Sequence, residues 1–559
     1  MTEPAGPVTA PASDRSRWDA DVVLSDGGTA HVRPIRPDDA DRFRAFWERL
    51  SRRTIYLRFF SARDRLTEDD LARMTVVDQT ARGGLIALIG DELIAVAHWE
   101  GRPGPTGAPE PDAEVAFLVE DAHQGRGIGS VLLEHLAAAA AARGIRRFSA
   151  EVLGGNRPMI GVFLDAGYTV TREWDSGVVH LVFEIAPTEL SVEVMRARER
   201  HAEAASITRL LNPRAVAVVG ASRRDGNAGN IVLRHLLAEG FAGPIYPVNP
   251  AAFGSDTQLA SVASVQAYPT VSDIPGPVDL AVVITPVEAL PAVVEDCAHG
   301  GVRALVVLTD LGDPGAEARL ATDTRAHGMR LVGPASLGVQ NPRAGLNASL
   351  APRMPPVGRV GCYSQSGPLA AALLEGAYAR GVGLSSFVSA GDRADVSGND
   401  MLQYWDGDSG TDVVLMHLEG FGNPRKFARL ARRIGRAKPV VVVTSGRFEL
   451  DDALLRQAGV IRVGRVSQGF DVAGLLASQP RPAGRRVAVV GDSRALVRLA
   501  TRAAEVAGLV PEAIVLPFGT SPADFAAALL AAAERADALM PVVVQVPPSQ
   551  PGPIAAAVS

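Results

Sequence analysis

The segment that decides the fold of the first part of the chain is Ala113-Glu114-Val115-Ala116-Phe117-Leu118-Val119, which Glu120–His123 joins to Gln124-Gly125-Arg126-Gly127-Ile128-Gly129. The apolar residues of the first segment predict a strand, and the glycines of the second predict a tight turn that opens a helix. Such a turn gathers backbone N–H groups at a helix N-terminus, where they can bind a pyrophosphate. A tight turn without a ligand has the same glycines, but the strand before it, the helix after it and Gln124 favour a phosphate-binding loop.

The segments around this loop predict an α+β unit with a mixed sheet over residues 18–187. Between two of its strands, Gly101–Gly107 is rich in Gly and Pro, which is typical of a hairpin loop. The expected elements are strands at Ala30–Ile35, Gly84–Gly90, Glu92–Trp99, Glu114–Val119 and Arg147–Val152, helices at Asp38–Ser51, Gly129–Arg143 and Pro158–Ala166, and a last hairpin of Thr169–Trp174 and Val178–Ile185.

After residue 187 the pattern changes. Residues 188–210 are charged, rich in Ala and free of Gly and Pro, which predicts a helical linker. Short β-branched runs then alternate with helical segments, which indicates parallel sheets with helices on both faces. We expect α/β domains at 211–345 and 346–480 and an incomplete one at 481–559, so the whole is a multidomain α/β protein. The runs are Ala215–Val219, Leu280–Ile284, Ala304–Leu308, Leu331–Val332, Arg359–Tyr363, Val413–Leu418, Val440–Thr444 and Arg485–Val490.

The composition excludes several classes of protein. A net charge of −6 over 559 residues argues against a basic surface for nucleic acid. The two cysteines, Cys297 and Cys362, lie far apart, which excludes a disulfide framework and a cysteine-based zinc site. No apolar run approaches the ~20 residues of a membrane span. Residues 1–17 predict a loose, disordered tail and no signal peptide. We expect a cytoplasmic protein without a metal and without a nucleic-acid or membrane partner.

The loop and the strand before it resemble motif A of the GNAT superfamily of N-acetyltransferases. The segment Asn156-Arg157-Pro158-Met159, with Phe163, Gly167 and Tyr168, resembles motif B. Leu50-Ser51 and Tyr56–Phe60 resemble a stretch typical of the protein-lysine-acetylating members. The resemblance implies acetyl-CoA as cosubstrate, with a splayed strand whose backbone pairs with the pantetheine amides. The implied binding residues are Phe117, Leu118, Val119, Gln124, Gly125, Arg126, Gly127, Ile128, Gly129, Ser130, Asn156 and Phe163.

An acetyl acceptor amine needs a base, because an alkylammonium with a pKa of about 10.4 is not a nucleophile. Glu114 matches the proposed general base of the Pat-type lysine acetyltransferases, although a carboxylate at a strand end can also be purely structural. Glu120 and Asp121, at the other end of the strand, are alternatives. Most GNAT enzymes have a Tyr that protonates the CoA thiolate, and Phe163 stands there instead. Either the thiolate leaves without an acid, with a thiol pKa of only about 8.5, or another group serves.

The second half resembles the NDP-forming acyl-CoA synthetases. Ala215–Ser222 and Tyr246–Pro250 resemble their Rossmann-like CoA-binding domain, and Ser364–Gly367, Gly391–Asp400 and Phe421–Phe427 resemble their flavodoxin-like, succinyl-CoA-ligase-type domains. This resemblance implies a second CoA site. At Ser364–Gly367 the alternative interpretation is a capped helix start that binds no ligand. The candidate residues of this second site are Gly220, Ala221, Ser222, Asn249, Ser364, Gln365 and Ser366.

Departures from that family predict that the ligase-like half is not catalytic. The family transfers phosphate through a histidine shortly after the strand that matches Val440–Gly446, and Arg447–Val460 contains none. Gly491-Asp492-Ser493 and Gly333-Pro334-Ala335-Ser336 lack the usual Asn residues. The last α/β unit ends without an ATP-grasp domain, which leaves open whether the chain is a shortened copy of a longer relative.

A GNAT domain joined to an inactive ligase-like region is the arrangement of the Pat-type bacterial protein lysine acetyltransferases. The resemblance implies a protein substrate with a reactive lysine, for example on an acyl-CoA synthetase, and CoA or acyl-CoA as an effector of the ligase-like region. A homo-oligomer would cover an unfinished sheet edge. Two alternatives stay open, which are a small-molecule amine acetyltransferase and a non-enzymatic CoA or acyl-CoA sensor.

Overall fold

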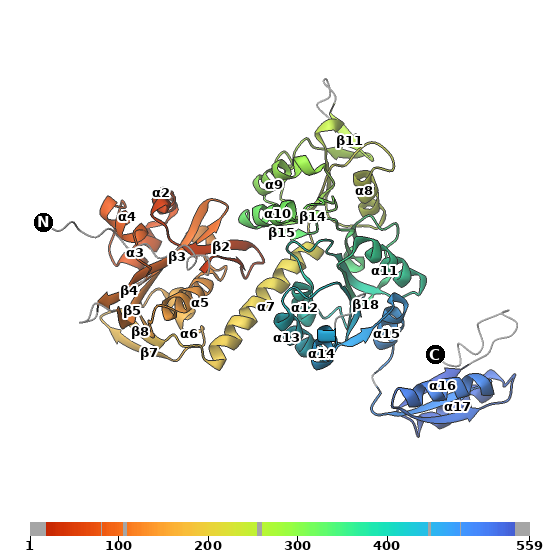
Figure 1. Ribbon diagram of the computed structural model, residues 1–559. Coiled ribbons are helices and arrows are strands. Elements are labelled where there is room, and N and C mark those ends of the chain that lie inside the picture. Colours follow the sequence, from red (N-terminus) through yellow and green to blue (C-terminus); the bar gives the residue numbers. More distant parts are fainter. Residues whose placement is uncertain are drawn as a thin grey trace. The chain divides into compact units, whose positions relative to one another are not determined.

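The computed structural model describes residues 18–79, 81–103, 109–253, 260–444, 449–480 and 482–542. The expected tail at 1–17 therefore lies outside the described residues. The chain divides into two compact units, Met1–Ala477 and Ser478–Ser559, and each is described by itself (Figure 1).

An eight-stranded sheet forms the first part of the larger unit, in the order β1-β2-β3-β4-β5-β6-β8-β7. All neighbours are antiparallel except β5 and β6, which confirms the mixed sheet. Its elements are β1 Ala20–Val23, β2 Thr29–Pro34, β3 Arg82–Ile89, β4 Glu92–Pro103, β5 Pro109–Val119, β6 Arg147–Leu153, β7 Val170–Asp175 and β8 Val178–Glu184, with helices α2 Ala40–Arg49, α3 Arg52–Phe59, α4 Glu68–Thr75, α5 Ile128–Ala141 and α6 Arg157–Leu164.

Both faces of this sheet are covered because successive side chains of a strand point to opposite sides. Along β3, Leu85 and Ala87 belong to the core that contains α5, whereas Ile86 and Leu88 belong to the core that contains α2. Strand β5 is likewise buried on both faces, with Val115 and Phe117 in the core that contains α5 and Leu118 in the core that contains α2.

Several elements differ from the sequence expectations, among them strand β1 and helix α4, which were not expected. Gly101–Pro103 continue β4, because Gly101 pairs with Ala113 and its N–H donates to the carbonyl of Ala81 at 2.7 Å, so the expected loop begins later. The rest of that loop, residues 104–107, lies outside the described residues. Helix α3 was not expected. It begins after Ser51, whose hydroxyl accepts a hydrogen bond from the N–H of Thr54.

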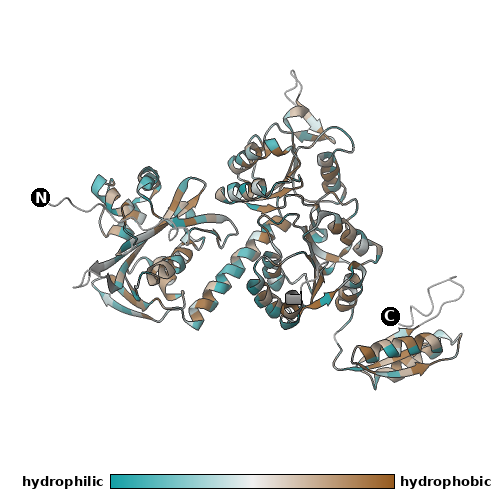
Figure 2. Cartoon of the chain, in the orientation of Figure 1, coloured by the Kyte–Doolittle hydropathy of each residue, from teal (hydrophilic) through white to brown (hydrophobic). Residues whose placement is uncertain are grey.

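Helix α7, Glu189–Leu211, follows this sheet (yellow in Figure 1). Thr188 caps its start in a capping box with Ser191, which satisfies N–H groups that have no partner in the first turn. Much of the helix is hydrophilic (Figure 2), and it buries Ala202, Ser206 and Leu210 near its end.

Two α/β sheets follow in the same unit. The first is parallel, in the order β10-β9-β13-β14-β15, and the second is mixed, in the order β17-β16-β19-β18-β20-β21-β22. The first sheet comprises β9 Val216–Val219, β10 Ile245–Val248, β13 Leu280–Val283, β14 Ala304–Val307 and β15 Arg330–Val332, with α8 Ala228–Ala238, α9 Leu290–His299, α10 Pro314–Ala326 and the hairpin β11 Ala260–Val262 and β12 Val265–Ala267. The second comprises β16 Gly338–Asn341, β17 Leu346–Ser349, β18 Val357–Ser364, β19 Leu384–Ser389, β20 Val413–Leu418, β21 Val440–Thr444 and β22 Ile461–Val463, with α11 Gly367–Ala379, α12 Gly398–Gly407, α13 Pro424–Ile434, α14 Glu449–Gln457 and α15 Val466–Ser478.

The smaller unit has a parallel three-stranded sheet in the order β24-β23-β25. It comprises β23 Arg486–Gly491, β24 Val510–Val515 and β25 Ala538–Val542, with α16 Arg494–Val506 and α17 Pro522–Ala533. Across the described residues of both units, no helix has the length and apolarity that a membrane crossing requires.

Candidate active site

A cavity of about 560 Å³ opens where β5 and β6 separate. The two strands pair only from Asp112 opposite Arg147 to Glu114 opposite Ser149, and then both run on. Residues of β5, β6, α3, α6 and the turn before α5 line the cavity. The splayed strand that the GNAT resemblance implies is therefore present, and the β5 backbone beyond Glu114 faces the opening instead of β6.

The turn at the end of β5 has the geometry of an anion-binding loop. Gly125 and Gly127 have φ of +77° and +78°, a region that glycine enters without strain. Gln124 fixes the turn to the strand, because its Nε2 donates to the carbonyl of Val119 at 3.1 Å. Helix α5 begins directly after Gly127, so its first N–H groups are free to bind an anion.

The structure brings together every acetyl-CoA residue expected from the sequence except Arg126. The residues predicted from the sequence that line the cavity are Glu114, Phe117, Leu118, Val119, Gln124, Gly125, Gly127, Ile128, Gly129, Ser130, Asn156 and Phe163. Asn156 also caps α6, since its Oδ1 accepts from the N–H of Met159 at 3.4 Å. Phe163 is buried, with its ring edge-on to Phe117 at 5.6 Å between centroids.

Arg126 lies in the turn, but its side chain is engaged elsewhere. Its Nε donates to Asp26 Oδ2 at 2.9 Å, and its Nη1 lies 2.7 Å from Nδ1 of His123. Any contribution of this residue to binding an anion in the cavity therefore comes through its backbone.

Glu114 lies at the point where the two strands part, and its side chain is exposed to the cavity. Arg58 of α3 lines the same cavity. Burial lowers the pKa of Arg58, and the carboxylate of Glu114 partly offsets this effect. The site thus places an exposed carboxylate in the electrostatic field of a partly desolvated cation.

The two alternative carboxylates are held by other groups. Glu120 is buried and accepts from Nε of Arg49 at 3.1 Å. Asp121 lines the cavity but accepts from Ser51 N–H at 2.9 Å, Ser51 Oγ at 2.7 Å and Thr54 Oγ1 at 2.8 Å. Burial raises the pKa of Asp121, but these hydrogen bonds outweigh burial and hold that pKa below its ordinary value. Asp121 is therefore a weak base, and Glu114 is the better candidate.

Helix α3 contributes cavity residues to which the sequence argument assigned no role. These residues are Arg53, Thr54, Leu57 and Arg58, with Phe60 directly after the helix. The resemblance of Leu50–Phe60 to lysine-acetylating members was the one available signal. It could not place the helix, because the contact of Ser51 with Asp121 joins residues 70 positions apart.

No tyrosine lines this cavity among the described residues. Phe163 occupies the motif B position, and its ring carries no ionisable group. The structure thus supplies no tyrosine acid at this point, in agreement with the sequence.

The residues expected for a second CoA site form two clusters in different sheets. Gly220, Ala221 and Ser222 follow β9, and Asn249 follows the neighbouring β10. Asn249 Nδ2 donates to the carbonyl of Ala221 at 2.8 Å, and Gly220 has a φ of +93°. These four residues therefore lie together at the carboxyl edge of a parallel sheet, where α/β folds bind ligands.

The second cluster lies after β18, at the start of α11. Ser364 Oγ accepts from the N–H of Ser366 at 3.2 Å and lies 3.4 Å from Nδ1 of His417. The Oε1 of Gln365 accepts from the N–H groups of Glu419 and Gly420 at 2.6 and 3.0 Å. These contacts join the three residues to neighbouring strands and loops of the second sheet.

Comparison with known families matches three segments of the chain. Residues 44–168 match the acetyltransferase (GNAT) family, 214–342 the CoA binding domain, and 357–451 the succinyl-CoA ligase like flavodoxin domain. The acetyltransferase match contains the cavity, and the other two contain the two clusters.

The individual relatives are either acyl-CoA ligases or acetyltransferases. The acetate–CoA ligase [ADP-forming] I subunit alpha of Pyrococcus furiosus is 32% identical over 54% of this chain and 70% of the relative. The acetyltransferase Pat of Mycolicibacterium smegmatis is 34% identical over 30% of this chain and 49% of the relative. A solved dinucleotide-forming acetyl-coenzyme A synthetase 1 of Ca. Korarchaeum cryptofilum is 30% identical, with a TM-score of 0.58 over 63% of this chain and 85% of that one.

Some relatives are much longer than the matched region. The chain spans 41% of the acetate–CoA ligase [ADP-forming] I of Archaeoglobus fulgidus, at 36% identity. An acetyltransferase domain thus precedes a region homologous to ADP-forming acyl-CoA ligases. Over its ligase-like part the chain belongs to the family of the ADP-forming acyl-CoA ligases, and the GNAT N-acetyltransferase domain that precedes this part gives an arrangement that matches the Pat-type fusion.

Proposed function

We propose that this protein transfers the acetyl group of acetyl-CoA to lysine side chains of other proteins, with acyl-CoA synthetases as the substrate class. The observation that carries the proposal is the cavity itself. An open β5 edge, an anion-binding turn and an exposed Glu114 line one space. The Pat relative and the basic helix α3 on the cavity wall support a protein acceptor over a small amine.

Each part of the cavity has a task in this reaction. The turn Gln124–Gly129 binds the pyrophosphate through backbone N–H groups, and Phe117–Val119 pair with the pantetheine amides. Glu114 accepts a proton from the lysine ammonium, directly or through a water, and the free amine attacks the thioester carbonyl carbon. The C–N bond forms as the C–S bond breaks, CoA leaves as the thiolate, and the nitrogen releases its second proton to solvent as the amide forms. Holding both reactants together supplies the proximity.

Arg58 assists by electrostatics. A cation beside the incoming ammonium disfavours its charged form and lowers the pKa of the lysine. The proton is then removed more easily at neutral pH. Because Phe163 offers no acid, the thiolate takes its proton from solvent in this proposal.

The ligase-like region has a regulatory role in this proposal. The sequence has no histidine between Val440 and Val460, where the ligase family carries its phosphorylated residue, and residues 445–448 lie outside the described part of the structure. The turn at Gly220–Ser222 with Asn249 keeps the geometry of a ligand-binding edge. CoA or an acyl-CoA that binds there would change acetyltransferase activity. We place the protein in the cytoplasm, where acyl-CoA synthetases and CoA meet.

Two measurements test this proposal. In the first, the full chain is incubated with acetyl-CoA and a purified AMP-forming acyl-CoA synthetase, and acetyl-lysine is located by mass spectrometry. Acetylation of the synthetase supports the proposal, whereas turnover on a polyamine alone would replace it with a small-amine transferase. In the second, Asn249→Ala should weaken activation or inhibition by added CoA while the basal rate stays unchanged. An unaltered response to CoA would remove the effector site from this edge.

A further inference from the structure

The turn between β1 and β2 lies directly against the phosphate turn, although 100 residues separate Asp26 from Arg126 in the chain. Asp26 accepts from Arg126 Nε at 2.9 Å and from Nη2 at 3.4 Å. The N–H of Ser25 donates to the carbonyl of Arg126 at 3.0 Å. The middle residue of the phosphate turn is thus held through its side chain and its backbone by residues outside the motif.

Asp26 is itself held in place. Its Oδ1 accepts from the N–H of Gly28 at 3.2 Å, and the turn is closed by hydrogen bonds between Leu24 and Gly28 and between Gly27 and Leu24, each of 2.8 Å. Gly27 has a φ of +82° and packs on α7, where an added Cβ would lie 2.7 Å from the backbone N of Ser206. Arg209 of α7 lies 3.8 Å from Asp26.

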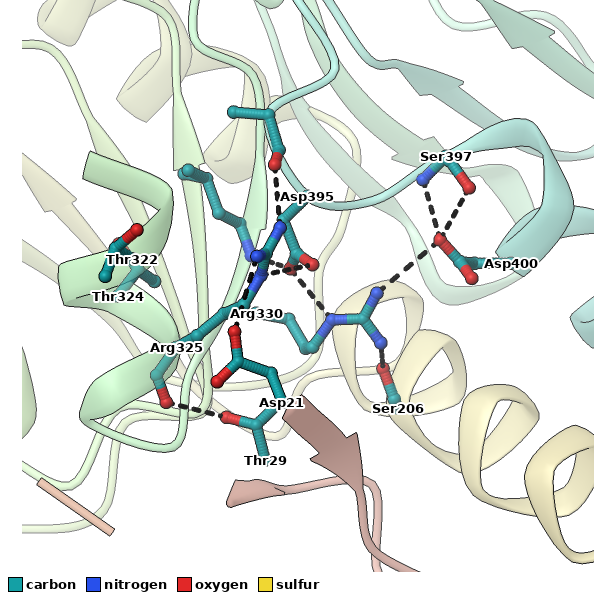
Figure 3. Close-up of polar contacts among 12 residues, drawn as sticks. Asp21, Thr29, Ser206, Thr322, Thr324, Arg325, Arg330, Asp395, Ser397 and Asp400 are labelled. Atoms are coloured by element: carbon teal, nitrogen blue, oxygen red, sulfur yellow. Dashed lines mark hydrogen bonds and ion pairs between the residues drawn. The ribbon is translucent and has the colours of Figure 1, made fainter. Parts of the chain in front are cut away.

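The part of α7 that supports this turn is held by the buried side chain of Arg330, which Figure 3 shows joined to Ser206. Arg330 donates to Ser206 Oγ at 2.7 Å and to Glu203 at 2.8 Å, and also pairs with Asp395 at 2.9 Å. Arg325 pairs with Asp395 and, at 3.5 Å, with Asp21 of β1. The β1–β2 turn therefore rests on a buried support instead of projecting into solvent.

A glycine-rich turn needs such support to bind an anion tightly. Gly125 and Gly127 lose more conformational freedom on ordering than other residues, and that loss is subtracted from the binding free energy when the turn is flexible before binding. An ion pair at the residue between these glycines orders the turn beforehand. Charge-assisted hydrogen bonds between Arg and a carboxylate are strong enough for this task.

We propose that Asp26 is a positioning residue for acetyl-CoA, which acts through Arg126 to hold the phosphate turn in its binding conformation. This inference rests on the proposed use of the cavity for acetyl-CoA. Asp26 itself does not touch the substrate. Its removal therefore affects binding of acetyl-CoA and leaves the chemical step largely intact.

The test compares three variants of the full chain with the wild type. Asp26→Asn removes the charge, Asp26→Glu keeps it, and Asp112→Asn removes a comparable carboxylate that pairs with Arg147 at 2.6 and 2.7 Å and does not line the cavity. Acetyl-CoA affinity is measured by calorimetry, and KM and kcat by acetyl transfer. Asp26→Asn should raise Kd and KM about tenfold, as expected for a charged hydrogen bond, with kcat within about twofold. Asp26→Glu should recover most of the affinity, and Asp112→Asn should behave as the wild type.

Several outcomes would overturn the inference. Unchanged binding in Asp26→Asn would show that the turn needs no such support. Tighter binding would show that Asp26 withholds Arg126 from the phosphates. A parallel fall in kcat and melting temperature, without rescue by Asp26→Glu, would show a purely structural role. A wild type that binds acetyl-CoA but acetylates nothing would contradict the proposed function, and the calorimetric comparison would still decide the role of Asp26.

Discussion

At the scale of single residues, environment separates three carboxylates that the sequence offers as candidate bases, among which the family resemblance favours Glu114. Glu120 forms an ion pair with Arg49, and Asp121 accepts hydrogen bonds from Ser51 and Thr54 that favour its anionic form. Glu114 is left exposed to the cavity. The sequence predicts its position at the start of the strand. The physical reason to prefer it as the base comes from the tertiary contacts of the other two carboxylates.

Arg58 gives a prediction at the same scale. Arg58→Met removes the cation beside Glu114, so the acceptor ammonium is no longer destabilised and its pKa rises toward the ordinary value. Activity rises with pH as the acceptor ammonium loses its proton, and the midpoint of this rise should move to higher pH by up to about one unit. Arg58→Lys retains the charge and should keep the wild-type profile. A pH profile of kcat that does not move in Arg58→Met would contradict the proposed role of this residue.

At the scale of elements, the strand, turn and helix around Gln124–Gly129 could be predicted from the sequence because their signals are local. Gly125 and Gly127 mark the positive φ values, and the apolar pattern marks β5. Helix α3 and strand β1 could not be predicted in this way. The residues of α3 mix Arg with apolar side chains without a clear stripe, and a carboxylate far along the chain holds the start of the helix.

Asp121→Asn tests whether the hydrogen bonds from Ser51 and Thr54 to Asp121 stabilise the start of α3. The pKa of Asp121 is lowered in the fold, so its stabilising contribution is present above the unfolded pKa of about 3.9 and is lost as pH falls below it. The variant should therefore be less stable than the wild type at pH 7, by at most about 1 kcal/mol for so exposed a group. The difference between the two proteins should be smaller at about pH 3. Urea unfolding at both pH values measures this, and an equal difference at both would contradict it.

At the scale of the whole molecule, the domain limits at 187, 210, 345 and 480 stay predictions. The long-range contacts lay beyond sequence reasoning, since Asp26 meets Arg126 and Arg330 meets Glu203 across 100 and 127 residues. Nothing in the local pattern around Asp26 marks it as part of the acetyl-CoA site. Such pairs depend on how β1, α5 and α7 pack.

Gly27→Ala tests the support that α7 gives to the phosphate turn. The added methyl meets the backbone of Ser206 and the residue must keep a positive φ, so the turn is expected to move off the helix. Acetyl-CoA affinity should fall severalfold. Gly144→Ala also replaces a glycine of positive φ, but its Cβ meets nothing within 4 Å, and it should leave acetyl-CoA affinity unchanged. Equal calorimetric affinities for both variants would contradict a role for α7.

The central claim is that one cavity, with Glu114 as the base, makes this chain a protein lysine acetyltransferase. The most direct measurement is the rate of lysine acetylation on a purified AMP-forming acyl-CoA synthetase by the wild type and by Glu114→Gln, each saturated with acetyl-CoA. We predict site-specific acetylation by the wild type and a rate lower by at least about a hundredfold in the variant, with acetyl-CoA affinity preserved. Equal rates for the two proteins, or no acetylated lysine with the wild type, would contradict the account.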